Sequence, residues 1–274
     1  MSFFLKHMAN NLWQGRFSIF PEDAVTHAVS ARLGGVSKVP YDSLNLALHV
    51  GDSSEDVCRN RDIFAGSLHL RSRDITTPEQ VHGDFVFRVT EKDRGRGSRA
   101  YDDSIPRTDA LITNVKGLPL LLCFADCVPV LFFDPENLAV GIAHAGWKGT
   151  MLKIGQKTLA AMGREFGTKP EACLVGIGPS IGPCCYEVGE NVQEECRKAF
   201  PNAWKELLVP GDDESVRLDL WQANRLQLLE AGVPERNVDC AEECTCCKHN
   251  WFFSYRAEGG KTGRIGAVIA LKEY

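Results

Sequence analysis

The chain has 274 residues, of which 44% are hydrophobic and 24% are charged, and its formal net charge is −5. A chain of this length and apolar content can bury a sizeable core, as one large domain or as two closely packed halves. The acidic balance, without any basic run, argues against binding to nucleic acid, although a few local arginines could hold a small phosphate.

The cysteine content and the apolar stretches indicate a protein whose cysteines are reduced and whose chain does not span a membrane. Eleven cysteines could form a disulfide framework in a short secreted protein, but this chain is long and has adjacent cysteine pairs at 184–185 and 246–247. Residues 1–13 are too few and too polar for the apolar part of a secretory signal. The apolar stretch 118–145 is interrupted by acidic residues and prolines, so it cannot span a bilayer. We expect a cytoplasmic protein.

The N-terminal part predicts strands and one helix. Residues 1–20 are typical of an N-terminal extension or an edge strand, and Val25–Ser30 is a short β-run. A helix is expected to begin at Ser53 or Ser54, because a hydroxyl can cap it and two acidic residues follow in its first turn. Phe85–Thr90 is the next predicted strand.

The central part contains three apolar runs, Leu118–Phe124, Val128–Phe133 and Leu138–Ala143, each broken by Asp, Pro or Gly. Such runs predict strands of a buried sheet. Potential metal ligands stand at the ends of predicted strands: Cys127, His144 and, ahead of Phe85, His82. Two histidines and one cysteine can hold zinc and leave a fourth position open, as catalytic sites do. The three residues are far apart in sequence, however, so spacing alone does not distinguish them from ordinary core and surface residues.

The C-terminal part alternates helices and strands. Thr150 is expected to cap a helix that ends near Phe166, and Asp219 with Gln222 predicts a capping box for another. The other predicted elements are helices at Val188–Phe200 and Leu220–Ala231, and strands at Cys173–Gly178, Phe252–Tyr255 and Arg264–Leu271.

Five segments carry a family resemblance. They are Gln80–Gly83 (QVHG), Ala125–Val130 (ADCVPV), Ala143–Gly149 (AHAGWKG), Gly178–Gly189 (GPSIGPCCYEVG) and Phe252–Arg256 (FFSYR). In this order they resemble the YfiH/YlmD family, also called laccase-domain or multicopper polyphenol oxidase-like, and regarded as purine nucleoside phosphorylase-like. The resemblance extends from about Ser30 to Leu271.

The resemblance implies a fold, a metal and a reaction. The fold would be α/β, a single domain over 1–274 with four layers, α/β/β/α, and mixed sheets, distantly similar to the catalytic domain of cytotoxic necrotizing factor. The metal at His82, Cys127 and His144 would be zinc, with copper less favoured. The reaction would be phosphorolysis of purine nucleosides (adenosine, inosine, guanosine and methylthioadenosine) by inorganic phosphate, with a secondary adenosine deaminase activity.

The two reactions need different side chains. Phosphorolysis needs phosphate beside the anomeric carbon, and a guanidinium fork pairs well with phosphate oxygens. Deamination needs a carboxylate that moves protons, for which Asp126 and Glu187 are both candidates. For phosphate we rank Arg256 first, followed by Arg32, Arg61 and Arg264, and for each of these arginines a surface ion pair is an equally good interpretation.

Other functions fit part of the same pattern. Cys127 and His144 could be the nucleophile and base of a cysteine hydrolase or amidase, as proposed for peptidoglycan quality control, and such an activity would survive chelation. A multicopper oxidase needs about ten histidine ligands and a cysteine, and this chain has seven histidines in all, which argues against a laccase. A metal-binding partner protein would bind zinc without turnover. The sequence does not indicate the oligomeric state.

The densest group of potential ligands lies near the C-terminus. It consists of Cys240, Cys244, Cys246, Cys247 and His249, and the CxxC of residues 244–247 alone would suggest a second zinc or redox site. The family pattern matches only Cys244 and Thr245, so we favour reduced core and loop thiols.

Overall fold

The computed structural model describes residues 3–211 and 215–273. No helix in this part of the chain is long and apolar enough to cross a lipid bilayer. The α-helices are α1 (Ser54–Gly66), α2 (Trp147–Met151), α3 (Ile154–Phe166), α4 (Glu190–Ala199), α5 (Trp204–Leu207) and α6 (Leu220–Glu230). The strands are β1 (Phe3–His7), β2 (Trp13–Phe17), β3 (Val25–Ser30), β4 (Val86–Arg88), β5 (Ala110–Thr113), β6 (Leu120–Phe124), β7 (Val128–Asp134), β8 (Ala139–Ala145), β9 (Leu174–Ile177), β10 (Leu208–Pro210), β11 (Val216–Leu218), β12 (Val238–Cys240) and β13 (Ile265–Leu271).

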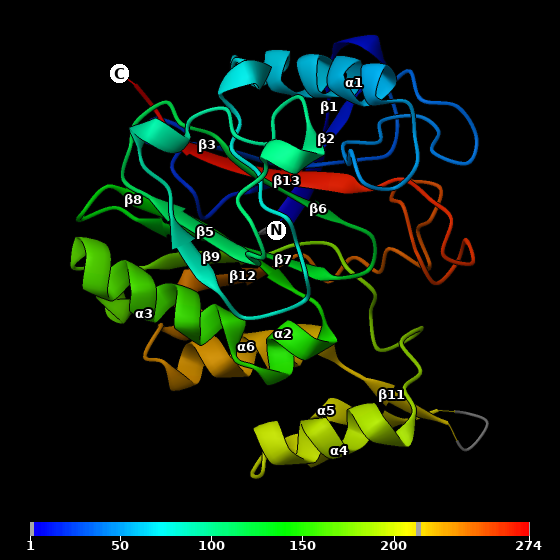
Figure 1. Cartoon of the computed structure of the whole chain (residues 1–274). Coiled ribbons are helices and arrows are strands. Elements are labelled where there is room, and N and C mark those ends of the chain that lie inside the picture. The colour runs from blue at the N-terminus through cyan, green and yellow to red at the C-terminus, as the bar shows by residue number, and fades with distance from the viewer. Residues whose placement is uncertain (1–2, 212–214, 274) are drawn as a thin grey trace.

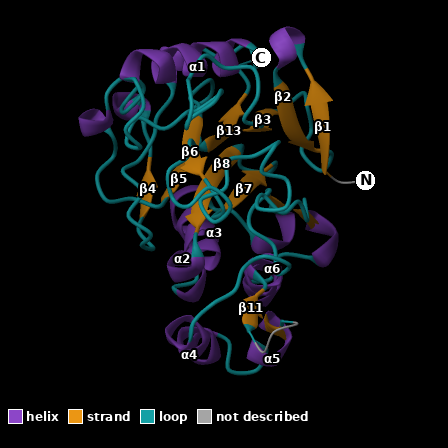
Figure 2. Cartoon of the chain, turned by 90° about the vertical axis from the view of Figure 1, so that its right-hand side faces the viewer, coloured by secondary structure: helices purple, strands orange, loops and turns teal. Residues whose placement is uncertain are grey.

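Two large sheets form the centre of the molecule. The smaller has the order β1-β2-β3-β13-β6 and is antiparallel throughout. The larger has the order β12-β9-β7-β8-β5-β4 and is mixed, because β12 runs parallel to β9 and β4 runs parallel to β5. A short ribbon of β10 and β11 lies apart from both, beside α4 and α5 (Figure 2).

The layers follow from the alternation of apolar side chains along the strands. Leu122 of β6 and Leu131 of β7 face the core between the two sheets. Leu121, the neighbour of Leu122 in β6, faces the opposite side of the sheet and packs with Phe64 of α1. Val130 of β7 packs in the core beneath α3 and α6. Helix α1 therefore covers one sheet and α2, α3 and α6 cover the other (Figure 1), which confirms the predicted α/β/β/α order.

Most predicted elements are confirmed, with boundaries that shift by a few residues. Strand β3 has the predicted bounds, and β1 is an edge strand, as expected for residues 1–20. Helix α1 begins at Ser54 with Ser53 as its cap, whose side chain accepts a hydrogen bond from the Asp56 N–H. The Asp219 side chain caps α6 by accepting from the Gln222 N–H at 2.9 Å.

Two local predictions are wrong. Thr150 does not cap the long helix, because it lies within α2, and a left-handed Lys153 (φ 62°) separates α2 from α3. Phe252–Tyr255 is not a strand: the Phe252 N–H donates to the Lys248 carbonyl, as in a turn. Its two phenylalanines are fully buried between the sheets, so the apolar run reflects core packing rather than strand pairing.

Candidate metal and substrate site

Three potential metal ligands meet at the end of the larger sheet. Cys127 lies in the turn between β6 and β7, and His144 lies near the end of β8. Because β7 and β8 are antiparallel, with Val128 opposite Ala145, the start of one strand lies beside the end of the other. His82 joins from the loop before β4. The ligand atoms of His82, Cys127 and His144 all lie within 4.8 Å of one another.

Asp109 holds two of these residues in place. This buried carboxylate, just before β5, accepts hydrogen bonds from the backbone N–H groups of His82 at 3.0 Å and Gly83 at 2.7 Å. Its Oδ1 also lies 2.8 Å from Nδ1 of His144. Nε2 of His144 is therefore the ring atom available to a metal, and the orienting carboxylate is a typical partner of a metal-binding histidine.

The charges in this group favour a thiolate beside a protonated imidazole. Burial raises the pKa of the Cys127 thiol, but His144 and His82 outweigh burial and lower that pKa below its ordinary value. Burial lowers the pKa of His144, but the Cys127 thiolate and Asp109 outweigh burial and raise it. A thiolate is the form of cysteine that binds metal or attacks as a nucleophile. The same three side chains therefore suit a nucleophile paired with an imidazolium or, once His144 has released the proton on Nε2, a metal centre.

The donor set fits zinc. Two imidazoles and one thiolate are ligands that zinc accepts, and three protein ligands leave a coordination position for a substrate oxygen or water. The site is also closely packed: a Cβ added to Gly146 would lie 2.9 Å from Sγ of Cys127 and 3.1 Å from Cδ2 of His82. The absence of a side chain at Gly146 therefore leaves the room that these two ligands occupy.

Asp126 connects the site to two later loops. Its carboxylate accepts hydrogen bonds from the Thr245 hydroxyl and from the Arg256 N–H, each at 2.6 Å. Its backbone carbonyl accepts from the Ile181 N–H at 2.9 Å. Glu187, the other carboxylate candidate, is exposed, and its backbone carbonyl accepts from the Arg256 guanidinium. Asp126 is thus engaged in holding loops, whereas the side chain of Glu187 is open to solvent.

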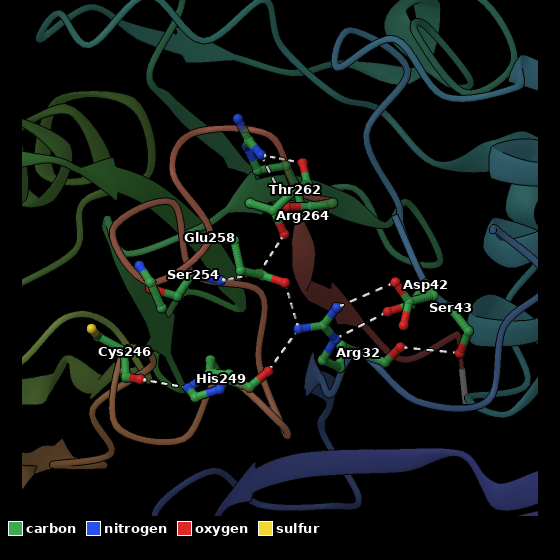
Figure 3. Close-up of polar contacts among 11 residues, drawn as sticks. Arg32, Asp42, Ser43, Cys246, His249, Ser254, Glu258, Thr262 and Arg264 are labelled. Carbon is green, nitrogen blue, oxygen red and sulfur yellow. Dashed lines mark hydrogen bonds and ion pairs between the residues drawn. The ribbon is translucent and has the colours of Figure 1, made fainter. Parts of the chain in front are cut away.

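Arg256 and Arg264 carry charges that no carboxylate neutralises through an ion pair within residues 3–211 and 215–273. Arg256 donates to the carbonyls of Cys185 at 3.2 Å and Glu187 at 3.0 Å. Arg264 uses Nη1 to donate to the carbonyls of Thr262 and Gly263 (Figure 3). Burial lowers the pKa of Arg264, and the thiols of Cys123 and Cys127 oppose that effect.

Arg32 and Arg61 hold the fold together. Arg32 is buried, forms an ion pair with Glu258 at 3.0 Å and donates to the carbonyls of Asp42 and His249 (Figure 3). Arg61 is buried in α1 and donates to the carbonyls of Leu46, Gly97 and Ser98. The Arg256 backbone N–H thus donates to Asp126, next to the candidate ligand Cys127, and Arg264 stands just before Ile265, which pairs with Phe124 of β6. Arg32 and Arg61, in contrast, are engaged in contacts within the protein.

Asp109 is a residue of the candidate site that the sequence does not predict, because a single Asp before a buried strand gives no local sign that it will meet His82 and His144. Burial, and after it the charges of Arg264, Arg61, His144 and His82, lower the pKa of His49 from 6.5 to about 4. Its ring lies 5.0 Å from that of Tyr101, on the loop that follows Arg99.

Chemistry rather than cavity size identifies the site. A surface groove of about 910 Å³ is lined by Arg16, His69 and Glu273 among others, and it contains none of the candidate metal ligands or the four arginines described above. A second groove, of about 630 Å³, lies around Asp62 and Arg99 and also contains none of them.

Comparison with known proteins agrees with the resemblance predicted from the motifs. The family described as multi-copper polyphenol oxidoreductase laccase matches residues 26–272. The protein named purine nucleoside phosphorylase YlmD of Geobacillus stearothermophilus is 42% identical over 249 residues, which cover 89% of each chain. Its Bacillus subtilis namesake is 38% identical over 88% of this chain and 86% of its own.

Solved structures agree with the fold. The crystal structure of YlmD from Geobacillus stearothermophilus superposes with a TM-score of 0.93 at 38% identity, covering 98% of this chain and 99% of that chain. The crystal structure of the hypothetical protein YfiH from Bacillus licheniformis gives a TM-score of 0.92 at 37% identity, with the same coverage. The chain therefore belongs to the multi-copper polyphenol oxidoreductase laccase family, together with the proteins named YlmD and YfiH.

Proposed function

We propose that this protein is a zinc-dependent purine nucleoside phosphorylase that acts on adenosine, inosine, guanosine and methylthioadenosine, with a secondary adenosine deaminase activity. The names of its relatives support the first activity. The observation that carries the proposal is the grouping of His82, Cys127 and His144 within 4.8 Å, with Asp109 orienting His144. We propose that these three residues hold the zinc ion and that the protein works in the cytoplasm.

Asp109 holds the proposed ligands in position before a metal binds. Asp109 fixes the loop of His82 and the ring of His144, so little reorganisation is needed when a metal binds. A bound zinc ion would supply a Lewis acid that polarises an oxygen of the substrate. Cys127 would contribute a negative charge to the metal site, since its thiol ionises readily beside two imidazoles.

The arginines would bind the phosphate. Phosphorolysis breaks the bond between ribose and base while positive charge develops on the sugar, so an anionic nucleophile must be held beside the anomeric carbon. The guanidinium groups of Arg256 and Arg264 have no carboxylate partner in the described part of the chain. A guanidinium binds phosphate oxygens in a fork. We assign phosphate binding to this pair and a structural role to Arg32 and Arg61.

The secondary deamination would use a carboxylate. A water molecule that attacks the purine must lose a proton, and the leaving ammonia must gain one. Asp126 already accepts two hydrogen bonds from Thr245 and Arg256, so we assign it a positioning role. Glu187 is the exposed carboxylate on the neighbouring loop and is the better candidate for the proton transfer.

The family name refers to copper, but the histidine content does not suit a laccase. The whole chain has seven histidines, and among the residues that the structure describes only His82 and His144 lie in the ligand group. A multicopper site needs about ten histidine ligands. We therefore propose zinc rather than copper and nucleoside chemistry rather than polyphenol oxidation.

A second candidate function rests on a different aspect of the same geometry. Asp109, His144 and Cys127 form a carboxylate, imidazole and thiol series in which Asp109 orients the imidazole beside the thiol. This is the arrangement of a cysteine hydrolase or amidase, in which His144 would act as the base and Cys127 as the nucleophile. Such an activity would not depend on metal.

Product analysis distinguishes these functions. Zinc-loaded protein is incubated with adenosine, with and without inorganic phosphate, and the products are identified by mass spectrometry. The proposal predicts adenine and ribose 1-phosphate only when phosphate is present. The smaller amount of deamination product is inosine without phosphate, and inosine and hypoxanthine with phosphate. Inosine alone would make deamination the main activity. If no nucleoside is consumed and an amide substrate is cleaved after chelation, the cysteine hydrolase replaces the phosphorylase.

A further inference from the structure

A second group of thiols lies outside the site described above. The Sγ atoms of Cys184, Cys185, Cys244 and Cys247 all lie within 4.8 Å of one another. Sγ of Cys247 is 3.5 Å from that of Cys184 and 3.4 Å from that of Cys185. All four are free cysteines, and only Cys244 is fully buried. Four thiols therefore surround one point near the surface.

The group joins two loops that are distant in sequence. One loop follows β9 and contains Cys184 and Cys185, and the other follows β12 and contains Cys244 and Cys247. Ser180 pairs with the second loop through its backbone, since its N–H donates to the Glu243 carbonyl and its carbonyl accepts from the Thr245 N–H. These two hydrogen bonds fix the separation of the loops, so the thiols are brought together by backbone pairing and not by chance side-chain rotation.

The backbone also favours a thiolate at Cys244. Its Sγ accepts hydrogen bonds from the Gly182 N–H at 3.3 Å and from the Cys247 N–H at 3.5 Å. The second bond runs within the CxxC turn of residues 244–247, and N–H groups directed at sulfur stabilise its ionised form. A buried sulfur that receives two N–H groups has the environment of a metal-bound thiolate.

From this geometry we propose that Cys184, Cys185, Cys244 and Cys247 bind a second zinc ion, as a closed structural site separate from the candidate catalytic centre. With zinc to sulfur distances of about 2.3 Å, the sulfurs of a tetrahedral site lie about 3.8 Å apart. The measured Sγ separations of 3.4 and 3.5 Å are within a few tenths of an ångström of that value. Binding would release the thiol protons to solvent and needs no oxidant or reductant.

The neighbouring cysteines and histidine are not part of this group. His249 directs Nδ1 to the carbonyl of Cys246 at 3.1 Å (Figure 3). Cys240 and Cys246 also lie outside the two groups of potential ligands found among the described residues. The second site thus takes only half of its ligands from the C-terminal cluster, and the other half come from the Cys184-Cys185 pair.

A metal at the second site would stabilise loops that contribute residues to the first site. Its two loops carry Arg256, whose guanidinium donates to the carbonyls of Cys185 and Glu187. The same loops carry Thr245, which donates to Asp126 beside Cys127. A metal at the four cysteines would therefore cross-link the two loops that place Arg256 and Glu187.

Metal content tests the proposal independently of activity. Protein purified without chelator is exchanged into metal-free buffer, and the number of zinc ions per chain is measured by inductively coupled plasma mass spectrometry. To exclude the first site, the measurement uses the Cys127→Ala/His144→Ala variant. We expect about one zinc ion per chain in this background, and almost none when Cys184→Ser and Cys247→Ser are added. The same protein loaded with cobalt should show the intense sulfur-to-cobalt absorption of a tetrahedral thiolate site.

The matched control is Cys246→Ser, which removes the cysteine next to Cys247 and should leave zinc content and the cobalt spectrum unchanged. Circular dichroism checks that each variant is folded. If the variant with both added serine substitutions does not fold, Cys184→Ser alone, a change at an exposed position, replaces it in the zinc measurement. Absence of zinc from the Cys127→Ala/His144→Ala variant overturns the proposal. A disulfide between two of these four cysteines, located by peptide mass mapping of protein kept without reductant, also overturns it, because those thiols would then not be free to bind metal.

Discussion

Asp109 fixes His144: the carboxylate Oδ1 lies 2.8 Å from Nδ1 of the imidazole, and the same carboxylate holds the backbone of His82. One buried side chain therefore sets the positions of two of the three proposed zinc ligands. Partners of this kind raise the basicity of a ligand and fix its ring. Asp109 is the residue through which the fold positions the site.

The first prediction concerns Asp109 itself. Asp109→Asn should weaken zinc binding at the first site by about 10- to 100-fold, because the amide no longer orients His144 as a carboxylate does. Competition with a chromophoric chelator measures the affinity. Asp84→Asn is the matched control, since the Asp84 carboxylate pairs with Lys157 near the surface. Equal zinc affinities for the two variants would show that Asp109 does not position the ligands.

The second prediction concerns Gly146. Gly146→Ala should lower zinc affinity at the first site and phosphorolysis together, because the new Cβ would lie 2.9 Å from Sγ of Cys127 and displace it. Gly66→Ala is the control, since a Cβ there meets no atom within 4 Å. Zinc titration and activity are compared with the melting temperature of each variant. If Gly146→Ala keeps the zinc affinity of the unchanged protein, Cys127 and His82 are not held as described.

The third prediction separates the arginines. Arg256→Gln should raise the KM for phosphate by about 10-fold or more, the value of a lost charge-assisted hydrogen bond, with little change in melting temperature. Arg236→Gln, a change at an exposed arginine in the turn Glu235–Asn237, is the control. Steady-state kinetics at varied phosphate and saturating inosine measure the effect. An unchanged phosphate KM would remove Arg256 from the phosphate site.

Arg32 should behave in the opposite way. Arg32→Gln should lower the free energy of unfolding by about 2 kcal/mol or more, because it leaves Glu258 and the His249 carbonyl without their buried partner. The phosphate KM of the folded fraction should stay the same. Urea unfolding and the same kinetics check both statements. A raised phosphate KM with normal stability would instead assign Arg32 to substrate binding.

The fourth prediction is a dependence of stability on pH. His27 is buried, and its Nε2 accepts a hydrogen bond from the Phe17 N–H at 2.9 Å. Burial, and secondarily the charge of Arg16, lower the pKa of His27 from 6.5 to about 3. Between these two pH values the unfolded chain binds a proton that the folded chain does not. Stability is therefore lost as the pH falls below 6.5, by at most about 1.4 kcal/mol per pH unit from this group.

Urea unfolding at pH 7, 6 and 5, compared between the unchanged chain and His27→Phe, measures this contribution. The variant should lose less stability on acidification, and the remaining dependence should come from other groups such as His49. The same pH dependence in both proteins would contradict the assignment.

The sequence predicts those features of the fold that depend on residues close to one another in the sequence. The apolar runs predict β6, β7 and β8, and the caps at Ser53 and Asp219 are local hydrogen bonds. It does not predict the break between α2 and α3, which depends on a left-handed lysine that no sequence pattern marks. The strand predicted at Phe252–Tyr255 fails because burial between two sheets requires apolar side chains whether or not the backbone is extended.

The candidate site shows the same limit. The grouping of His82, Cys127 and His144 follows from the family motifs, but the link from Asp109 to two of these residues depends on sheet register. The cysteine pairs at 184–185 and 244–247 likewise meet only through the pairing of two distant loops. Contacts of this kind are properties of the tertiary structure, and the local pattern of residues does not encode them.

The most direct test of the central claim is phosphorolysis of inosine, which cannot be deaminated at the position that adenosine deaminases attack. Hypoxanthine and ribose 1-phosphate are measured for the zinc-loaded chain, Cys127→Ala and Cys246→Ala. The account predicts full activity in the unchanged chain and in Cys246→Ala, and a loss of about 100-fold or more in Cys127→Ala. Undiminished ribose 1-phosphate formation by a folded Cys127→Ala variant would contradict it.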